Sequence, residues 1–154
     1  MYAFSRTLFS EALIVTAVLI LSSASVLAGS PGDLTPRVPP AHLEKAKSFH
    51  NPFPPSADII AKGKKLYEGK ALCAACHGFE GAGGTSGGRS TSPGAQQPTN
   101  FADAAWQAAR TDGEIFWVLN HGSHGTDMAP YMPLYLSEDQ VWHIVTYIRM
   151  FGGT

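Results

Sequence analysis

The stretch C73-A74-A75-C76-H77 contains the only two cysteines among the 154 residues of the chain. Its pattern is C-x-x-C-H, and residues three apart on a helical turn lie on the same side of it. Both thiols can therefore react with one group, while the imidazole that follows lies beside them. Two cysteines are too few for a scaffold of several disulfides or for a structural zinc site of four cysteines. We expect this pair to have a chemical role.

The C-x-x-C-H pattern indicates covalent attachment of a c-type haem. Each thiol can bond to one vinyl group of the porphyrin, and His77 can bind the iron through Nε2. Other roles of the cysteines stay open. A thioredoxin-like dithiol needs a βαβ context that the sequence does not show, and a disulfide between Cys73 and Cys76 is compatible with an exported protein. A zinc site with His121 and His124 has a short histidine spacing and leaves His77 unused.

A second iron ligand is expected in the loop 122–137, which reads GSHGTDMAPYMPLYLS. The loop contains Met128, Met132 and His124, and His121 directly precedes it. A thioether is a soft ligand, and methionine is a second haem ligand in electron carriers. Both methionines lie in a Gly- and Pro-rich loop and not on a helix face, which favours a ligand over a filler of the core.

The amino-terminal segment predicts export. Residues 12–21, ALIVTAVLIL, are apolar, and Val26 and Ala28 occupy the −3 and −1 positions of a cleavage site. We interpret residues 1–28 as a secretory signal peptide. The alternative is an uncleaved membrane anchor, because the 17 residues from 12 to 28 reach the lower limit of the ~17–25 that span a bilayer. We expect a periplasmic domain, membrane-associated if the segment is retained.

Residues 29–55 contain seven of the eleven prolines and predict an extended arm or linker. Proline fixes φ and removes a hydrogen-bond donor, so neither a long helix nor a central strand fits here. A short helical turn is compatible with residues 41–49. The sequence leaves open whether the arm is free, wraps the domain or docks on a partner.

Residues 56–154 are predicted to form one all-α domain of three or four short helices. No stretch shows the period-2 alternation of a strand. Seven glycines in the 17 positions of residues 78–94 predict a long loop, of a kind that is often functional or wrapped around something. A domain this small buries little surface, so a bound cofactor would complete its core. Capping signals mark three helix starts: Ser56, the pair Thr111 and Glu114, and the pair Ser137 and Gln140.

The domain resembles a class I, monohaem cytochrome c of the bacterial type over residues 56–152. The resemblance rests on three stretches: C73-A-A-C-H77, G125-T-D-M128 and W142-H-I-V-T-Y-I-R149. It implies a small helical bundle wrapped around one haem c, which is bound covalently through two thioethers. It also implies that the first and last helices cross, with Gly63 and Tyr67 meeting Ile144 and Tyr147.

The resemblance implies a methionine ligand in a G-T-x-M-P sequence, which is split in this chain. Met128 follows the G-T pair, whereas Met132 precedes the proline. We favour Met128, because the family's ligand loop returns to the last helix over the longer stretch. The expected haem-binding residues are therefore Cys73, Cys76, His77 and Met128, with His77 and Met128 on the iron. The resemblance also implies that a loop-proline carbonyl accepts Nδ1–H of the histidine; the candidates are Pro98 and Pro93.

The resemblance implies an electron carrier and not an enzyme, with iron cycling between Fe(II) and Fe(III). Its partners would be redox proteins, met either as a shuttle or as the cytochrome subunit of a larger oxidoreductase. A net charge of −1 gives no basic excess for a nucleic-acid partner. The alternative function is a haem enzyme or gas sensor with an open sixth iron position. Lysines at 62, 64, 65 and 70 are either a solvated face or steer acidic partners.

Overall fold

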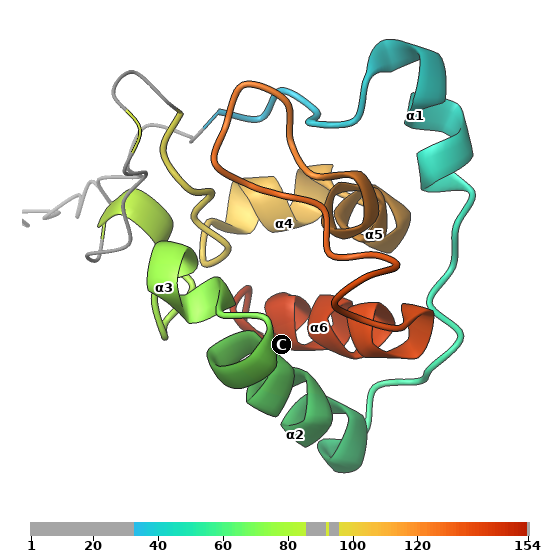
Figure 1. Ribbon diagram of the computed structural model, residues 1–154, viewed down its shortest axis with the longest axis vertical. Helices are drawn as coiled ribbons and strands as arrows, with labels where there is room; N and C mark the ends of the chain where they lie inside the picture. Colours follow the sequence, from blue (N-terminus) through green and yellow to red (C-terminus); the bar gives the residue numbers. More distant parts are fainter. Residues whose placement is uncertain (1–32, 86–91, 93–95, 154) are drawn as a thin grey trace, which may run out of the picture.

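A computed structural model describes residues 33–85, 92 and 96–153, which fold into a set of helices and contain no strand (Figure 1). The elements are α1 (Pro40–Lys47), α2 (Ala57–Lys65), a π-helical turn η1 (Leu66–Lys70), α3 (Cys73–His77), a 3-10 turn η2 (Gly83–Thr85), α4 (Ala104–Ala109), α5 (Asp112–His121) and α6 (Glu138–Met150). The all-α prediction is confirmed. The signal segment 1–28 lies outside the described residues and stays a prediction. Across the described ranges, no helix is both long and apolar enough to cross a bilayer.

The three predicted helix starts are confirmed. The Ser56 side chain accepts a hydrogen bond from the N–H of Ile59 at the start of α2. Two reciprocal capping boxes open α5 and α6, formed by the predicted pairs at Thr111 and at Ser137. Each box satisfies backbone donors that a helix start leaves without a partner inside the helix. These short polar signals therefore fix where the helices begin.

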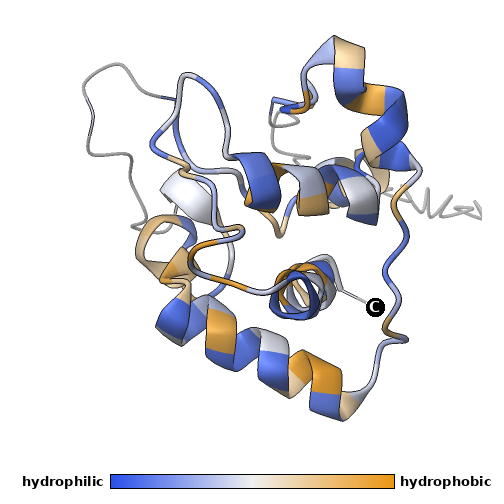
Figure 2. Cartoon of the chain, turned by 45° about the vertical axis from the view of Figure 1, so that its right-hand side comes forward, coloured by the Kyte–Doolittle hydropathy of each residue, from blue (hydrophilic) through white to orange (hydrophobic). Residues whose placement is uncertain are grey.

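The crossing of α2 and α6 is also confirmed. A Cβ added to Gly63 would stand 2.1 Å from the carbonyl oxygen of His143 and 2.8 Å from Cβ of Tyr147, so only glycine allows this approach. Tyr67 is fully buried and packs edge-on against Tyr147, with ring centroids 5.3 Å apart. Figure 2 shows hydrophobic residues interspersed with hydrophilic ones along α2. Val141, Ile144 and Val145 place the centre of the core on α6.

The proline-rich arm wraps the domain. A Cβ on Gly113 would stand 2.0 Å from the carbonyl oxygen of Ala46, so α1 and the start of α5 touch backbone to backbone. His42 stacks on Trp117 at 4.9 Å between ring centroids. The Asn51 side chain then donates to Thr146 Oγ1 at 2.9 Å and links the arm to α6. The sequence left the position of this segment open, and the structure places residues 33–55 against α5 and α6.

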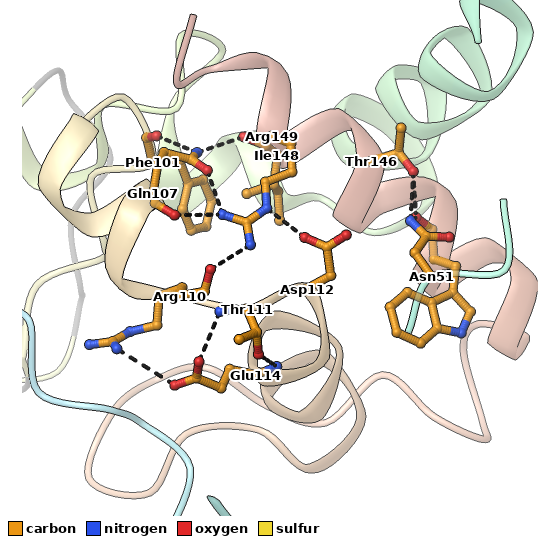
Figure 3. A network of polar contacts seen from close by, with 11 residues as sticks. Asn51, Phe101, Gln107, Arg110, Thr111, Asp112, Glu114, Thr146, Ile148 and Arg149 are labelled. Carbon is orange, nitrogen blue, oxygen red and sulfur yellow. Dashed lines mark hydrogen bonds and ion pairs between the residues drawn. The ribbon is translucent and has the colours of Figure 1, made fainter. Parts of the chain in front are cut away.

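A polar network holds α6 to the end of α4 and the start of α5 (Figure 3). The Arg149 guanidinium donates to Asp112 Oδ1 at 2.6 Å and to both the backbone and side-chain oxygens of Gln107 at 2.9 and 2.8 Å. It also donates to the carbonyl of Arg110 at 2.6 Å. A planar guanidinium suits this task because its donors point outward in a fixed fork.

Candidate functional site

The C-x-x-C-H stretch forms the short helix α3, as its spacing predicts. Leu72 precedes it in the left-handed conformation, with φ of 52°, and so turns the chain between η1 and α3. Cys73 is buried and Cys76 is exposed, and both are free thiols. Burial raises the pKa of the Cys73 thiol to about 12. The two sulfurs and the imidazole of His77 therefore come from a single turn of backbone.

Next to α3 lies a cavity that is partly open to solvent. Most of the lining side chains are apolar or aromatic. Besides Leu72, Cys73, Cys76 and His77, they include Tyr67, Phe101, Trp106, Ile115, Leu119, Met128 and Tyr131.

His77 is oriented by a backbone carbonyl. Its Nδ1 lies 3.1 Å from the carbonyl oxygen of Thr99, and its ring stacks on Phe101 with centroids 4.3 Å apart. Burial lowers the pKa of His77, so the neutral ring is favoured. With Nδ1 donating to Thr99, Nε2 is the nitrogen left to bind a metal.

The prediction that Pro98 supplies this carbonyl is wrong by one residue. The Pro98 carbonyl accepts instead from the N–H of Gly84, at 3.4 Å. Pro93, the other candidate, lies outside the described residues. The path of this loop depends on the Gly-rich segment before it. Because the loop is irregular, its sequence has no repeating pattern that predicts which carbonyl faces His77.

The two methionines lie in different places. Met128 lines the same cavity as His77, whereas Met132 lines a separate hollow with Phe49 and Trp142. The backbone around Met128 is tied down: its N–H donates to Thr126 Oγ1 at 3.1 Å, and its carbonyl accepts from Ser123 at 2.9 Å. Of the two methionines, only Met128 therefore lines the cavity that contains His77.

His121 and His124 are not among the residues that line this cavity. His121 stacks on Trp117 at 3.7 Å between ring centroids, and its Nδ1 lies 3.0 Å from the Trp117 carbonyl oxygen. His124 is exposed. Among residues 33–85, 92 and 96–153, no group of three or more His, Cys, Asp or Glu side chains is arranged to hold a metal ion. The zinc interpretation gains no support from this arrangement.

Several lining residues were not predicted. Tyr67 lines the cavity and donates from its hydroxyl to the Gly78 carbonyl at 2.9 Å, bracing the end of α3. Arg37 and Val38 reach the cavity from the arm. Arg37 and Val38 are separated from the motif by more than thirty positions. Only the docking of the arm, which no sequence pattern fixed, brings them to the site.

We compared the chain with models of protein families, with solved structures and with curated proteins. A family model described as cytochrome c matches residues 60–151. Among solved structures, a chain of the reducing HAO-like protein complex of Kuenenia stuttgartiensis is 26% identical with a TM-score of 0.51; the match covers 65% of this chain and 46% of that one. This chain thus spans less than half of that relative. A search of curated proteins gave no match.

Two further solved structures are similar at lower TM-scores. The c-type cytochrome KustC0563 is 34% identical, with a TM-score of 0.45 and coverage of 58% of this chain and 95% of that one. Cytochrome cL of the marine methylotrophic bacterium Methylophaga aminisulfidivorans is 19% identical, with a TM-score of 0.47 and coverage of 71% of this chain and 63% of that one.

Proposed function

The chain belongs to the cytochrome c family, and from this we propose that it transfers electrons through one haem c held by Cys73, Cys76, His77 and Met128. The observation that carries the proposal is a single cavity lined by all four of these side chains. Two free thiols on one helical turn, an imidazole with Nδ1 already bonded and a thioether match the ligands of a covalently bound haem with His and Met on the iron.

The residues around the cavity have distinct tasks. Thr99 fixes the tautomer and the ring orientation of His77, and such an outer hydrogen bond raises the basicity of a metal-binding imidazole. Phe101 prevents the imidazole from tilting by stacking on it, with an interplanar angle of 16°. Tyr131 donates to the Ala71 carbonyl at 2.6 Å and so closes the wall beside Cys73. When bound, haem supplies one-electron Fe(II)/Fe(III) chemistry.

If His77 and Met128 both held the iron, no position on it would be left for a substrate, and the protein would act as an electron carrier and not as an enzyme. The mainly apolar lining limits the access of water, and low polarity and methionine ligation are the means by which a protein sets a haem potential. Residues 1–28 have the sequence pattern of a secretory signal peptide, and this supports a periplasmic location for the domain.

The partners of this domain are redox proteins, with which it can exchange electrons in two ways. It is either a mobile shuttle or the cytochrome subunit of a larger oxidoreductase. One similar solved chain belongs to a protein complex, and this supports the second mode. Membrane association follows if the amino-terminal segment stays attached.

The test is expression in cells that have the haem-attachment machinery, followed by denaturation of the exported protein. We expect the mass of one haem to remain on the unfolded chain, together with a two-thioether absorbance spectrum. Cys76→Ser should leave one thioether and change that spectrum. Carbon monoxide should bind the reduced native protein slowly or not at all; fast binding would indicate an open iron position. A colourless, metal-free preparation would refute the proposal.

A further inference from the structure

The arm that precedes the family match forms part of the cavity wall. Arg37 and Val38 line the cavity, although the match begins only at residue 60. In Figure 1 the segment leading into α1 lies apart from α3, the helix that carries the two cysteines. Val38 is 3% exposed and packs in a small cluster with Ala46 and Trp117, which fixes this segment.

Arg37 is oriented at the wall by polar partners. Its guanidinium donates to the side-chain oxygen of Gln96, another lining residue, and pairs with Asp33 at 3.2 Å. Gln96 Nε2 donates in turn to Asp33 Oδ2 at 2.6 Å. Hydrogen bonds, first from Thr35 and then from Gln96, lower the pKa of Asp33 to about 2, so this carboxylate stays charged. Within the described ranges, these contacts engage two of the five N–H donors of Arg37.

A second arginine at the cavity is already balanced. Arg110 pairs with Glu114 at 3.6 Å, and both side chains are nearly inaccessible, at 8% and 3% exposure (Figure 3). It also donates to the Leu34 carbonyl and so anchors the arm. Asp33, by contrast, is 46% exposed, and water screens its attraction for Arg37. Of the two arginines that line the cavity in the described part of the chain, Arg37 is therefore the one with charge and donors to offer a ligand.

Haem carries two carboxylate groups on the edge away from its vinyl groups. Building on the proposed function, we propose that Arg37 binds a haem carboxylate, so that the arm contributes a cofactor-binding residue from outside the family match. The planar fork of a guanidinium matches a carboxylate, and its charge does not titrate. A fixed cation beside the haem also favours the ferrous state, which carries one positive charge fewer on the iron.

The test compares Arg37→Gln with Lys45→Gln in the exported, haem-bearing protein. Both substitutions remove one positive charge from the arm, but Lys45 is exposed on α1 and does not line the cavity. At one applied potential, Arg37→Gln should lower the ferrous-to-ferric ratio about three- to tenfold, the size expected for a partly screened unit charge. Lys45→Gln should change it less than about 1.5-fold, and this small effect should vanish at high salt.

A second readout is independent of net charge. The low-frequency resonance Raman band from bending of the haem carboxylates should shift in Arg37→Gln. It should also shift in Arg37→Lys, which keeps the charge but loses the fork, and this covers the case in which Arg37→Gln does not fold. Equal potential shifts in the glutamine variants, or an unmoved carboxylate band, would overturn the inference about Arg37 alone. A wild-type protein without attached haem would overturn it together with the proposed function.

Discussion

Gly63 and His143 touch through their backbones: a Cβ on Gly63 would stand 2.1 Å from the carbonyl oxygen of His143. This contact sets the distance between α2 and α6. The η1 turn that follows α2 leads directly into the haem-binding motif. The position of the haem-binding motif relative to the core therefore depends on the absence of a side chain at Gly63.

Gly63→Ala should destabilise the protein by about 2–4 kcal/mol, because the clash is with backbone that cannot rotate away. The measurement is urea unfolding followed by circular dichroism. Gly69→Ala is the matched control, since a Cβ there meets nothing within 4 Å. It should be neutral or stabilising by up to about 1 kcal/mol. Equal losses in the two variants would contradict the crossing described here.

Gly113→Ala should release the arm. The added Cβ would lie 2.0 Å from the Ala46 carbonyl oxygen, which belongs to α1. We expect faster proteolysis within residues 33–55, while the haem spectrum at the motif persists. Mass spectrometry of the first fragments checks the position of cleavage. Cleavage at the wild-type rate would mean that α1 does not dock on α5.

Met128→Leu should abolish the weak long-wavelength iron–sulfur band and lower the reduction potential, since methionine ligation raises it. Met132→Leu should keep both, because Met132 lies in a separate hollow beside Trp142. Absorbance spectra of the oxidised proteins give the answer. Loss of the band only in the Met132 variant would reverse the ligand assignment.

Arg149→Met should cost about 2–4 kcal/mol of unfolding free energy, because several oxygens of the α4–α5 segment lose their donor. Arg149→Lys should recover only part of this, since an ammonium group lacks the fork. Lys45→Met, on the exposed face of α1, should stay within about 0.5 kcal/mol of wild type. Denaturant titration of the haem-bearing proteins measures all three.

His143 should make stability fall with acidification. Burial, with a smaller effect of Lys62, lowers its pKa in the folded protein. The unfolded chain therefore binds the proton more readily as the pH falls through the ordinary histidine range near 6.5, and this favours unfolding. An NMR titration should give a midpoint for His143 below that ordinary value. His143→Gln should flatten the fall in stability across this pH range, and an unchanged profile would speak against the effect.

Local signals predicted the helices well. Ser56, Thr111 and Ser137 each act through hydrogen bonds within three residues, so their effect is contained in the sequence around them. Gly63 is different in kind. The family resemblance gave its partner helix, while the identity of the contacting atom, the carbonyl oxygen of His143, required the structure.

Contacts between distant segments were not predictable in the same way. The proline content of residues 29–55 excluded a long helix but carried no information about what the arm would touch. The carbonyl that receives Nδ1 of His77 depends on the path of an irregular loop, and the expectation missed it by one residue. Both contacts depend on the path of an irregular segment, and the spacing of apolar residues predicts helices and strands but not such paths.

Because the arm is docked, the folded domain begins before the region that matches the family model. A recombinant fragment trimmed to the homologous region would start at residue 60. Such a fragment would lack the N-cap of α2 and the whole of α1. Trp117 would then be exposed to solvent on the side that α1 covers. The folding unit of this molecule is therefore longer than its evolutionary signature, and fragments for expression should begin well upstream, near residue 33.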